Sequence, residues 1–305
     1  MRVRTPRVSV PADDLVPIRV AGVPEHFNMP WLLGLERRAF ARAGVEVKWR
    51  TVPQGTGAMC EMLHRGEIDL AVMVTEGAVG DILKGGANRI VAPFVDSPIT
   101  WGVHVGAWTG IHDPAGLEGL PILISRPNSG SHLAALCYAH WQGWSVGAND
   151  LEVVQDLGGA LDRLNRPGPA VFLWERFTTR PYVLDGRLRQ VDAYKAEWPS
   201  FLLVATEAVL ADHPAGIIRL LKVLRDQASG LMAKRTAPEL IAKRYDLSLG
   251  DAQAWFTDVR WNTGTPLTEA TLRRVVDALV ASGTLGPVPT GSSLLDRLVW
   301  TPADR

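Results

Sequence analysis

Cysteine is scarce in this sequence, since the 305 residues include only Cys60 and Cys137. The two lie far apart in the chain, and neither belongs to a Cys/His set with the spacing of a metal site. This scarcity excludes a disulfide framework and a cysteine-based metal centre. We expect two buried free thiols, no bound metal and no other cofactor.

Charge of one sign is not in excess either. Lys and Arg together number 32, as do Asp and Glu, so the formal net charge is zero. No block or stripe of basic residues stands out along the chain. This balance argues against nucleic acid as a partner.

Long apolar runs are also missing. No run reaches the roughly 18 apolar residues of a membrane-spanning helix, so no membrane span is expected. The first residues are basic, but the apolar stretch of about 7–15 residues that a secretory signal needs does not follow them. The sequence as written is therefore expected to be cytoplasmic. A start upstream of Met1, or a trimmed chain, would instead permit a periplasmic or cell-surface location.

Familiar catalytic signatures are absent from the sequence. It contains no Walker A loop, no complete G-x-G-x-x-G, no HExxH, no G-x-S-x-G and no CxxC. The seven histidines are scattered, and none has an evident nucleophile beside it. His26 and His132 lie in loops discussed below, where hydrogen bonding to a ligand is the favoured role and acid–base catalysis is the alternative.

The first part of the chain alternates strands and helices. Apolar or alternating runs predict strands at 18–23, 45–52 and 68–74. Asn28 as a capping residue and Pro30 in the first turn predict a helix that ends at Gly44. A turn at 53–57 leads into a second helix, which ends near Gly66. This order predicts a parallel α/β sheet with helical crossovers.

The pattern restarts after a stretch rich in Gly and Pro. Strands are predicted at 121–125, 151–154 and 170–174, and helices from Ser131, at 158–164 and from Glu175. Helical spacing dominates the last third, at 215–231, 238–245, 249–259 and 268–282. Two further extended runs, at 100–105 and 200–205, flank this second unit. We predict a loose arm at 1–17, one lobe from 18–101 plus 201–305, an inserted lobe at 102–200, and a two-strand hinge between them.

A ligand of such a fold is expected beyond the carboxyl ends of the strands. The loop from 125 to 132 is the most informative, because it is rich in Ser and Gly and leads into a helix. One interpretation is a cradle for an anion or carbonyl group; the other is that Ser129 or Ser131 caps its own helix. The candidate ligand-binding residues in the loops after the strands are His26, Asn28, Gln54, Thr56, Gly57, Thr75, Asn128, Ser129, Gly130, Ser131 and His132.

Two glutamates each end a buried apolar strand, which makes their carboxylates costly to bury unpaired. Glu76 and Glu175 are predicted either to accept hydrogen bonds from an amine or amidine-like ligand, or to form salt bridges with nearby arginines. Trp174 either stacks on a ligand ring or belongs to the core. All three are included among the candidate ligand-binding residues.

Several segments resemble one known superfamily. PQGTGAMCEMLHRGEIDLAVMVTEG at 53–77 is similar to the first-lobe signature of the periplasmic-binding-protein type II superfamily, in its branch near the sulfonate, taurine and thiamine-precursor binders. ISRPNSGSHL at 124–133, FLWERFTTRP at 172–181 and YDLSLGDAQAWF at 245–256 resemble a narrower subgroup of fungal and bacterial proteins of uncertain ligand. The resemblance extends from about residue 18 to 285.

The resemblance implies a two-lobed α/β fold of the Venus-flytrap type, with two mixed sheets, flanking helices and a two-strand hinge. It implies that the loops at 24–28, 54–57, 75–76, 125–132 and 174–175 line the cleft. The expected function is binding of a small polar, heteroaromatic or amine-bearing solute, with an ABC-transporter permease as a possible partner. The alternative is an enzyme of thiamine-precursor or other cofactor biosynthesis. The cysteine-rich iron site of the yeast-type pyrimidine synthase is missing here, so that activity is not carried over.

Overall fold

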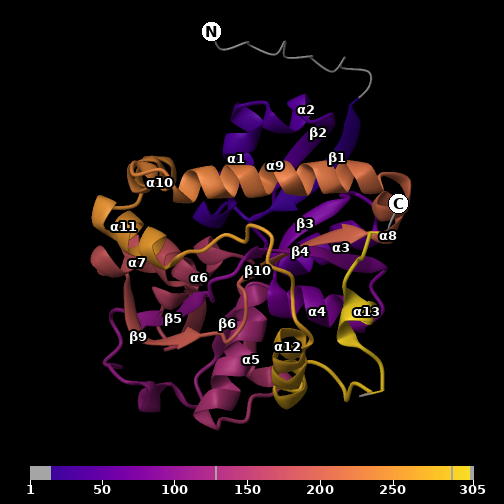
Figure 1. The fold of residues 1–305 in the computed structure, drawn as a ribbon. Helices are drawn as coiled ribbons and strands as arrows, with labels where there is room; N and C mark the ends of the chain where they lie inside the picture. The colour runs from indigo at the N-terminus through magenta and orange to yellow at the C-terminus, as the bar shows by residue number, and fades with distance from the viewer. Residues whose placement is uncertain (1–14, 128, 290, 303–305) are drawn as a thin grey trace.

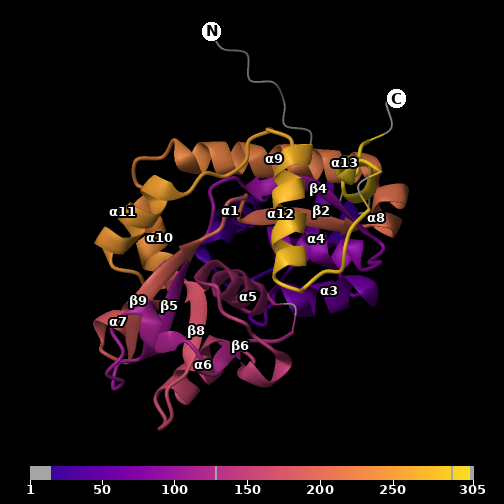
Figure 2. The ribbon, with the colours of Figure 1, turned by 90° about the horizontal axis from the view of Figure 1, so that it is seen from below.

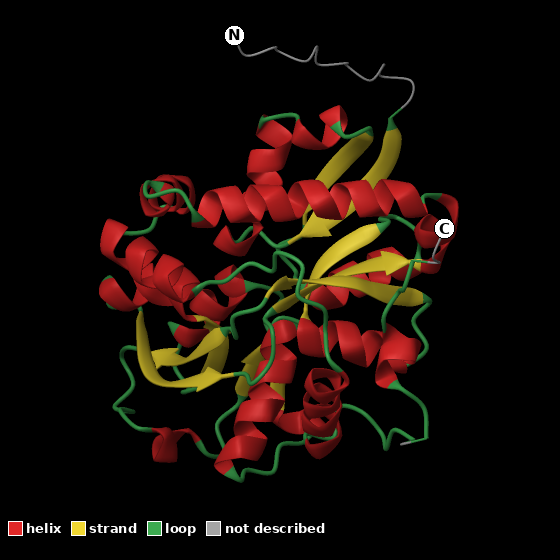
Figure 3. Ribbon diagram, in the orientation of Figure 1, coloured by secondary structure: helices red, strands yellow, loops and turns green. Residues whose placement is uncertain are grey.

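A computed structural model describes residues 15–127, 129–289 and 291–302 of the chain. Two five-stranded sheets, each flanked by helices, divide these residues into two lobes (Figure 3). The first sheet has the order β2-β1-β3-β10-β4. Its strands are β1 (Val16–Gly22), β2 (Val45–Thr51), β3 (Leu70–Val74), β4 (Asn88–Val95) and β10 (Phe201–Thr206).

The second sheet is made from consecutive strands in the middle of the chain. Its order is β7-β6-β8-β5-β9. The strands are β5 (Thr100–Gly106), β6 (Ile122–Ile124), β7 (Leu151–Val153), β8 (Val171–Glu175) and β9 (Leu188–Lys195). In the first sheet β10 runs antiparallel to β3 and β4, and in the second β5 runs antiparallel to β8 and β9. Both sheets are therefore mixed and follow the same plan, as predicted.

Helices fill the connections and cover the sheets. The longest, α9, packs against α1, α2 and β2 across the first sheet (Figure 1), and α12 packs between α4 and α5 (Figure 2). The α-helices are α1 (Met29–Glu36), α2 (Ala39–Arg42), α3 (Thr56–His64), α4 (Thr75–Leu83), α5 (Gly130–Gln142), α6 (Leu157–Leu164), α7 (Arg176–Leu184), α8 (Glu207–Asp212), α9 (Pro214–Met232), α10 (Ala237–Tyr245), α11 (Leu249–Asp258), α12 (Glu269–Ala281) and α13 (Leu294–Leu298). Within the described ranges, no helix is both long and apolar enough to cross a membrane.

The chain passes between the sheets twice, through the segments 96–99 and 196–200, which we call the crossing segments. They are hydrogen-bonded to each other: the Ser200 amide donates to the Ser97 carbonyl at 3.2 Å, and the Ala196 amide to the Ile99 carbonyl at 3.4 Å. The predicted hinge strands, 100–105 and 200–205, are instead ladder strands within the sheets. The passage itself is confined to the short segments before them. The predicted lobe boundaries stay a prediction.

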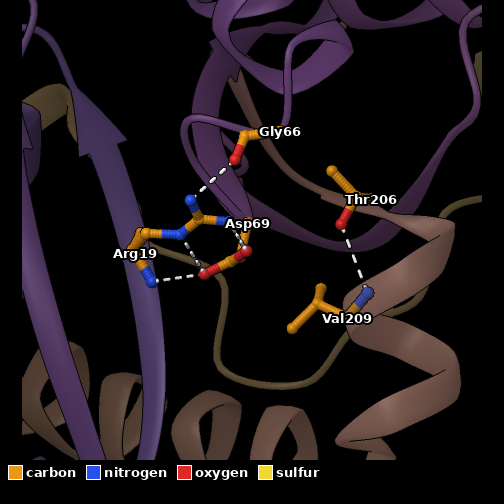
Figure 4. A network of polar contacts seen from close by, with 5 residues as sticks. All are labelled: Arg19, Gly66, Asp69, Thr206 and Val209. Atoms are coloured by element: carbon orange, nitrogen blue, oxygen red, sulfur yellow. Dashed lines mark hydrogen bonds and ion pairs between the residues drawn. The ribbon is translucent and has the colours of Figure 1, made fainter.

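A local polar network ties β1 to the turn before β3 (Figure 4). The backbone amide and side-chain Nε of Arg19 both donate to Asp69 Oδ2, at 2.7 and 3.0 Å, and Nη1 donates to the Gly66 carbonyl at 2.6 Å. The same figure shows the Thr206 hydroxyl accepting from the Val209 amide, which caps α8 directly after β10. Both contacts fix how the chain enters or leaves a strand of the first sheet.

Three of the predictions for the start of the chain are wrong. The predicted single helix from 28 to 44 breaks at Arg38, whose φ of 51° is left-handed, so α1 and α2 are separate. The Asn28 side chain does not cap it, because its amide donates to the Val23 carbonyl at 2.8 Å. Residues 16 and 17, predicted as part of a loose arm, belong to β1 because they pair with β2. The rest of that arm, 1–14, lies outside the described residues.

Some elements were not predicted. β9 carries charged and polar residues along an edge of its sheet, so its sequence lacks a continuous apolar run. β4 contains Pro93, which lowers strand propensity and is tolerated here because β4 is also an edge strand. The helix α4 begins directly after β3, with no loop between them, so the sequence pattern did not separate its first residues from the end of the strand.

Opposite effects are expected for two Gly→Ala substitutions, one at the end of a strand and one within a helix. A Cβ at Gly106, the last residue of β5, would lie 2.2 Å from the Leu164 carbonyl oxygen, so Gly106→Ala should lower the free energy of unfolding by about 1–3 kcal/mol. A Cβ at Gly230 on α9 meets no atom within 4 Å, so Gly230→Ala should raise it by about 0.5–1 kcal/mol. Urea unfolding of both variants measures this. Equal stability of the two would contradict the backbone approach at Gly106.

Candidate functional site

A pocket lies between the two sheets, where strand ends from both meet. The parallel strands contribute the residues after their carboxyl ends, and the antiparallel strands β5 and β10 contribute residues at their starts. The pocket encloses about 410 Å³ of space free of protein atoms, including its mouth. Ligands of open α/β sheets bind beyond the carboxyl ends of the strands.

The walls of the pocket are largely apolar. They are formed by Val23, Val74, Ile99, Trp101, Trp174 and Phe201. Trp174 stacks on Phe172, with ring centroids 5.3 Å apart, and is half-buried, so it is both a core residue and a pocket wall. Trp101 is 5% exposed, and its Nε1 has no hydrogen-bond partner among the described residues. An indole N–H without a partner is costly in a protein interior.

Serines form the polar wall at the start of α5. The Ser131 hydroxyl accepts from the Ser125 amide at 2.9 Å and shares hydrogen bonds with the hydroxyls of Ser125 and Ser129. Ser129 is the N-cap of α5, since its hydroxyl accepts from the His132 amide. Ser129 is thus used for capping, while Ser125, Gly130 and Ser131 line the pocket. The capping interpretation is confirmed for Ser129, and the cradle for an anion or carbonyl group stays a prediction.

Two carboxyl groups face the same pocket, from Glu25 after β1 and Glu175 at the end of β8. Glu175 is 3% exposed, and its Oε2 accepts from the Thr178 amide at 2.7 Å and hydroxyl at 2.8 Å, which caps α7. Burial raises the pKa of Glu175. Glu25 is half-buried by exposed area, yet its carboxyl is surrounded closely enough for desolvation, with the charge of Glu175, to raise its pKa to about 8.

His26 lies next to this pair but is not a cation. Its Nε2 is 3.7 Å from Glu175 Oε2, within reach of an ion pair. Burial, however, lowers the pKa of His26 to about 3, so the ring is neutral near pH 7 and the contact is not a salt bridge. Phe27 and Trp255 pack on the ring with centroids 5.1 and 4.1 Å away. His26 is therefore an aromatic core residue behind Glu175.

The structure brings five of the predicted residues together in the pocket: Thr56, Gly130, Ser131, Trp174 and Glu175. Thr56 also accepts a hydrogen bond from the Val74 amide at 3.1 Å. Asn128 lies outside the described residues. Ser129 and His26 stand behind pocket residues, as described above.

The other predicted residues are placed elsewhere. Glu76 is in the first turn of α4, accepts from Trp198 Nε1 at 2.9 Å, and with Gly57 lines a second cavity between α3, α4 and the start of α5. The Thr75 hydroxyl donates to the Pro199 carbonyl in a crossing segment. Asn28 is bonded to Val23, as described above. Gln54 and His132 are half-buried and line none of the described pockets.

Sequence reasoning missed several wall residues. Glu25 falls in the loop 24–28, which was expected at the cleft. It does not directly end an apolar strand, as Glu175 does, so its position in the sequence did not mark it as a buried carboxylate. Trp101 and Phe201 belong to β5 and β10, which run antiparallel to β8 and β3. The starts of these two strands therefore lie at the pocket, and not their ends. Among described residues, no group of three or more His, Cys, Asp or Glu side chains is placed to hold a metal ion. Cys60 and Cys137 are free and buried, as predicted.

The raised pKa of Glu25 makes stability fall with rising pH. Between its ordinary value of 4.5 and about 8, the folded carboxyl keeps a proton that the unfolded chain has lost, so the free energy of unfolding decreases across this window. Glu25→Gln should remove that decrease, so that the variant's advantage over the natural protein grows from pH 5 to pH 8. Urea unfolding at several pH values measures it, with Glu46→Gln on the exposed face of β2 as control. Parallel curves for all three proteins would contradict it.

Solved structures share this architecture. The Candida albicans CA3427 gene product, described as defining a new family with the generic periplasmic binding protein structural fold, superposes with a TM-score of 0.84 and 26% identity over 90% of this chain and 92% of that one. The alkanesulfonate-binding protein SsuA from Xanthomonas axonopodis pv. citri, bound to MOPS, gives 0.76 and 15% over 94% and 99%. The aliphatic sulphonate binding protein SsuA from Escherichia coli gives 0.67 and 14% over 95% and 93%.

By sequence alone, no protein-family model matches the chain and no curated protein matches it. The likeness is therefore carried by the arrangement of the two sheets and by the motifs. The chain has the two-lobed α/β fold of the periplasmic binding proteins, which confirms its resemblance to their type II superfamily.

Proposed function

We propose that this protein binds one small organic molecule in the pocket between its lobes. The molecule would have a flat, largely apolar body and at least one edge of N–H donors. The observation that carries this proposal is that two tryptophans and two glutamates, contributed by both lobes, line a single pocket. Aromatic walls suit a flat ring, and carboxyl groups suit an amine or amidine edge.

The pocket also offers hydrogen-bond donors on its other walls. The Ser125 and Ser131 hydroxyls at the start of α5 favour a carbonyl or other acceptor on the same side. A heteroaromatic molecule with donors along one edge and acceptors along another satisfies both sets.

Opening and closing would take place at the crossing segments. The lobes would move as two units, one carrying the first sheet and the other the second, with pocket walls separating as they part. Hinges of this kind absorb motion in a few residues outside regular elements. A ligand that contacts both lobes stabilises the closed form by its differential affinity for it.

Sulfonate binding, named for two of the similar structures, is not carried over. Among the residues that the structure describes, none lining this pocket is Lys, Arg or His, whereas two are glutamates. The fold also serves the ligand-binding component of an ABC-type import system from Staphylococcus aureus. Delivery of the ligand to such a permease is the transport role that we include in the proposal.

One observation favours an enzyme as second candidate. Glu25, with a pKa raised to about 8, would be protonated near neutral pH and would act as a general acid beside Glu175. His26 is buried behind the pocket and His132 lines none of the described pockets, so neither supports catalysis. A ligand recovered unchanged after long incubation with the protein favours binding; a changed mass favours turnover.

Filling the pocket tests its role. A Cβ at Gly130 would lie 3.0 Å from the Trp101 ring and 3.5 Å from Val74, so Gly130→Val narrows the pocket while removing no side-chain hydrogen bond. Native mass spectrometry of protein purified without refolding should show a retained small molecule that this variant loses. Gly250→Val, at an exposed site on α11 with no atom nearer than 4.0 Å, should keep it. Equal retention by both variants would place the ligand elsewhere.

A further inference from the structure

The two pocket carboxyl groups have little positive charge near them. Glu175 faces Glu25, His26 and Arg176; of these, His26 is neutral because it is buried, and Arg176 is exposed on α7 with its guanidinium 5.0 Å over the Phe177 ring. The charge of Arg176 lowers the pKa of Glu175, but burial outweighs it and the net direction is upward. The pair is therefore not neutralised by a cation inside the pocket.

The neighbours of Glu25 do not supply a cation either. Tyr245 lies close enough for Glu25 to raise its pKa, and its hydroxyl is buried without a partner among the described residues. Arg244, next along α10, forms a salt bridge with Glu36 instead. Among the described residues, each group named near the pair is thus a neutral phenol or ring, or an arginine that is exposed or already paired.

Buried carboxyl groups without a cation share protons instead of ionising together. Two acids that line one pocket form a site that a positively charged ring compound would complete. Trp101 and Trp174 also line this pocket, and aromatic rings attract organic cations.

We infer that the ligand of this pocket is a singly charged organic cation of the amidinium or protonated amino-heterocycle class, whose charge replaces a proton on the Glu25–Glu175 pair. This inference rests on the proposed function and adds the charge of the ligand to it. On binding, one proton leaves the pair for solvent as the cation enters, so the total charge of the filled site is unchanged. The affinity for the cation therefore rises with pH.

The steepness of this rise follows from the number of protons released. One proton per bound cation gives about a tenfold gain in affinity per pH unit while the pair is mostly protonated. Since the pKa of Glu25 is raised to about 8, the gain should run from about pH 6 and level off near pH 8.

Three benzene derivatives separate charge from fit: benzamidinium, neutral benzamide, whose substituent is planar like that of benzamidinium, and anionic benzenesulfonate. Isothermal titration of the full chain should show benzamidinium binding at least about tenfold more tightly than benzamide at pH 8, and no binding of benzenesulfonate. Benzamidinium affinity should rise by at least about tenfold from pH 6 to pH 8. Heats in buffers of different ionisation enthalpy should report about one proton released.

Variants assign the effect to the pair. Glu25→Gln should weaken benzamidinium binding by at least about tenfold at pH 8 and flatten its pH dependence, while benzamide binding changes little. Glu46→Gln, on the exposed face of β2, should leave both unchanged. Gly130→Val should abolish binding of either probe, which assigns it to this pocket.

The outcomes separate this inference from the proposed function. The inference that the ligand is a cation would be overturned if benzamide bound as tightly as benzamidinium, or if the affinity for benzamidinium did not depend on pH. Either result would leave the pocket as a ligand site. Benzamidinium that binds Gly130→Val as well as the natural protein, or that does not bind at all, would also overturn the inference. A retained molecule that Gly130→Val fails to displace would instead overturn the proposed function.

Discussion

The hydrogen bonds between the two crossing segments are the constraint on which this architecture depends. Ser97 and Ile99 on the first passage accept from Ser200 and Ala196 on the second, and the Thr75 amide at the start of α4 donates to the Ser200 carbonyl at 3.1 Å. These contacts hold the starts of β5 and β10 together at one point. Ile99 of the first crossing segment lines the pocket beside Trp101 and Phe201, near the starts of β5 and β10, so part of the wall is built by the chain that joins the lobes.

This placement explains why the site is electrostatically unusual. Strand ends from both sheets converge over an apolar floor, so the carboxyl groups that follow β1 and β8 are withdrawn from water. Burial raises the pKa values of Glu175 and Glu76 and lowers that of His26, which favours the neutral form of each. Glu76 obtains a hydrogen bond from Trp198 at 2.9 Å, and Glu175 obtains two from Thr178 at 2.7 and 2.8 Å. Of the three glutamates, Glu25 and Glu175 line the pocket.

Much of the fold could be predicted from the sequence, because apolar runs such as 68–74 and 170–174 mark buried strands whichever sheet they join. The cleft loops after those strands followed from the same reasoning, and Glu175 and Ser131 lie where it put them. Glu76 does not, because α4 begins directly after β3 and turns this side chain towards a second cavity. Whether a residue one position beyond a strand faces the cleft depends on where the next helix begins, which spacing alone does not show.

The contributions of Trp101 and Phe201 could not be predicted for a different reason. Both sit at the starts of antiparallel strands, and the direction of a strand is decided by pairing with distant residues. The break at Arg38 could not be predicted either. Its backbone lies in the left-handed region, which a glycine in the sequence often indicates but an arginine does not.

The inserted sheet begins and ends at one place: Thr100, the first residue of β5, is paired with Lys195, the last of β9. A long insertion is costly to a domain mainly when its ends must be brought together from a distance, and here the insertion closes on itself. For the first lobe, the inserted unit therefore adds little more loop-closure cost than a tight turn between β4 and β10 would add. The inserted unit is joined to the first lobe by two chain segments that lie side by side. New chain ends opened in a loop of the inserted unit would therefore leave the strand pairing of both sheets intact.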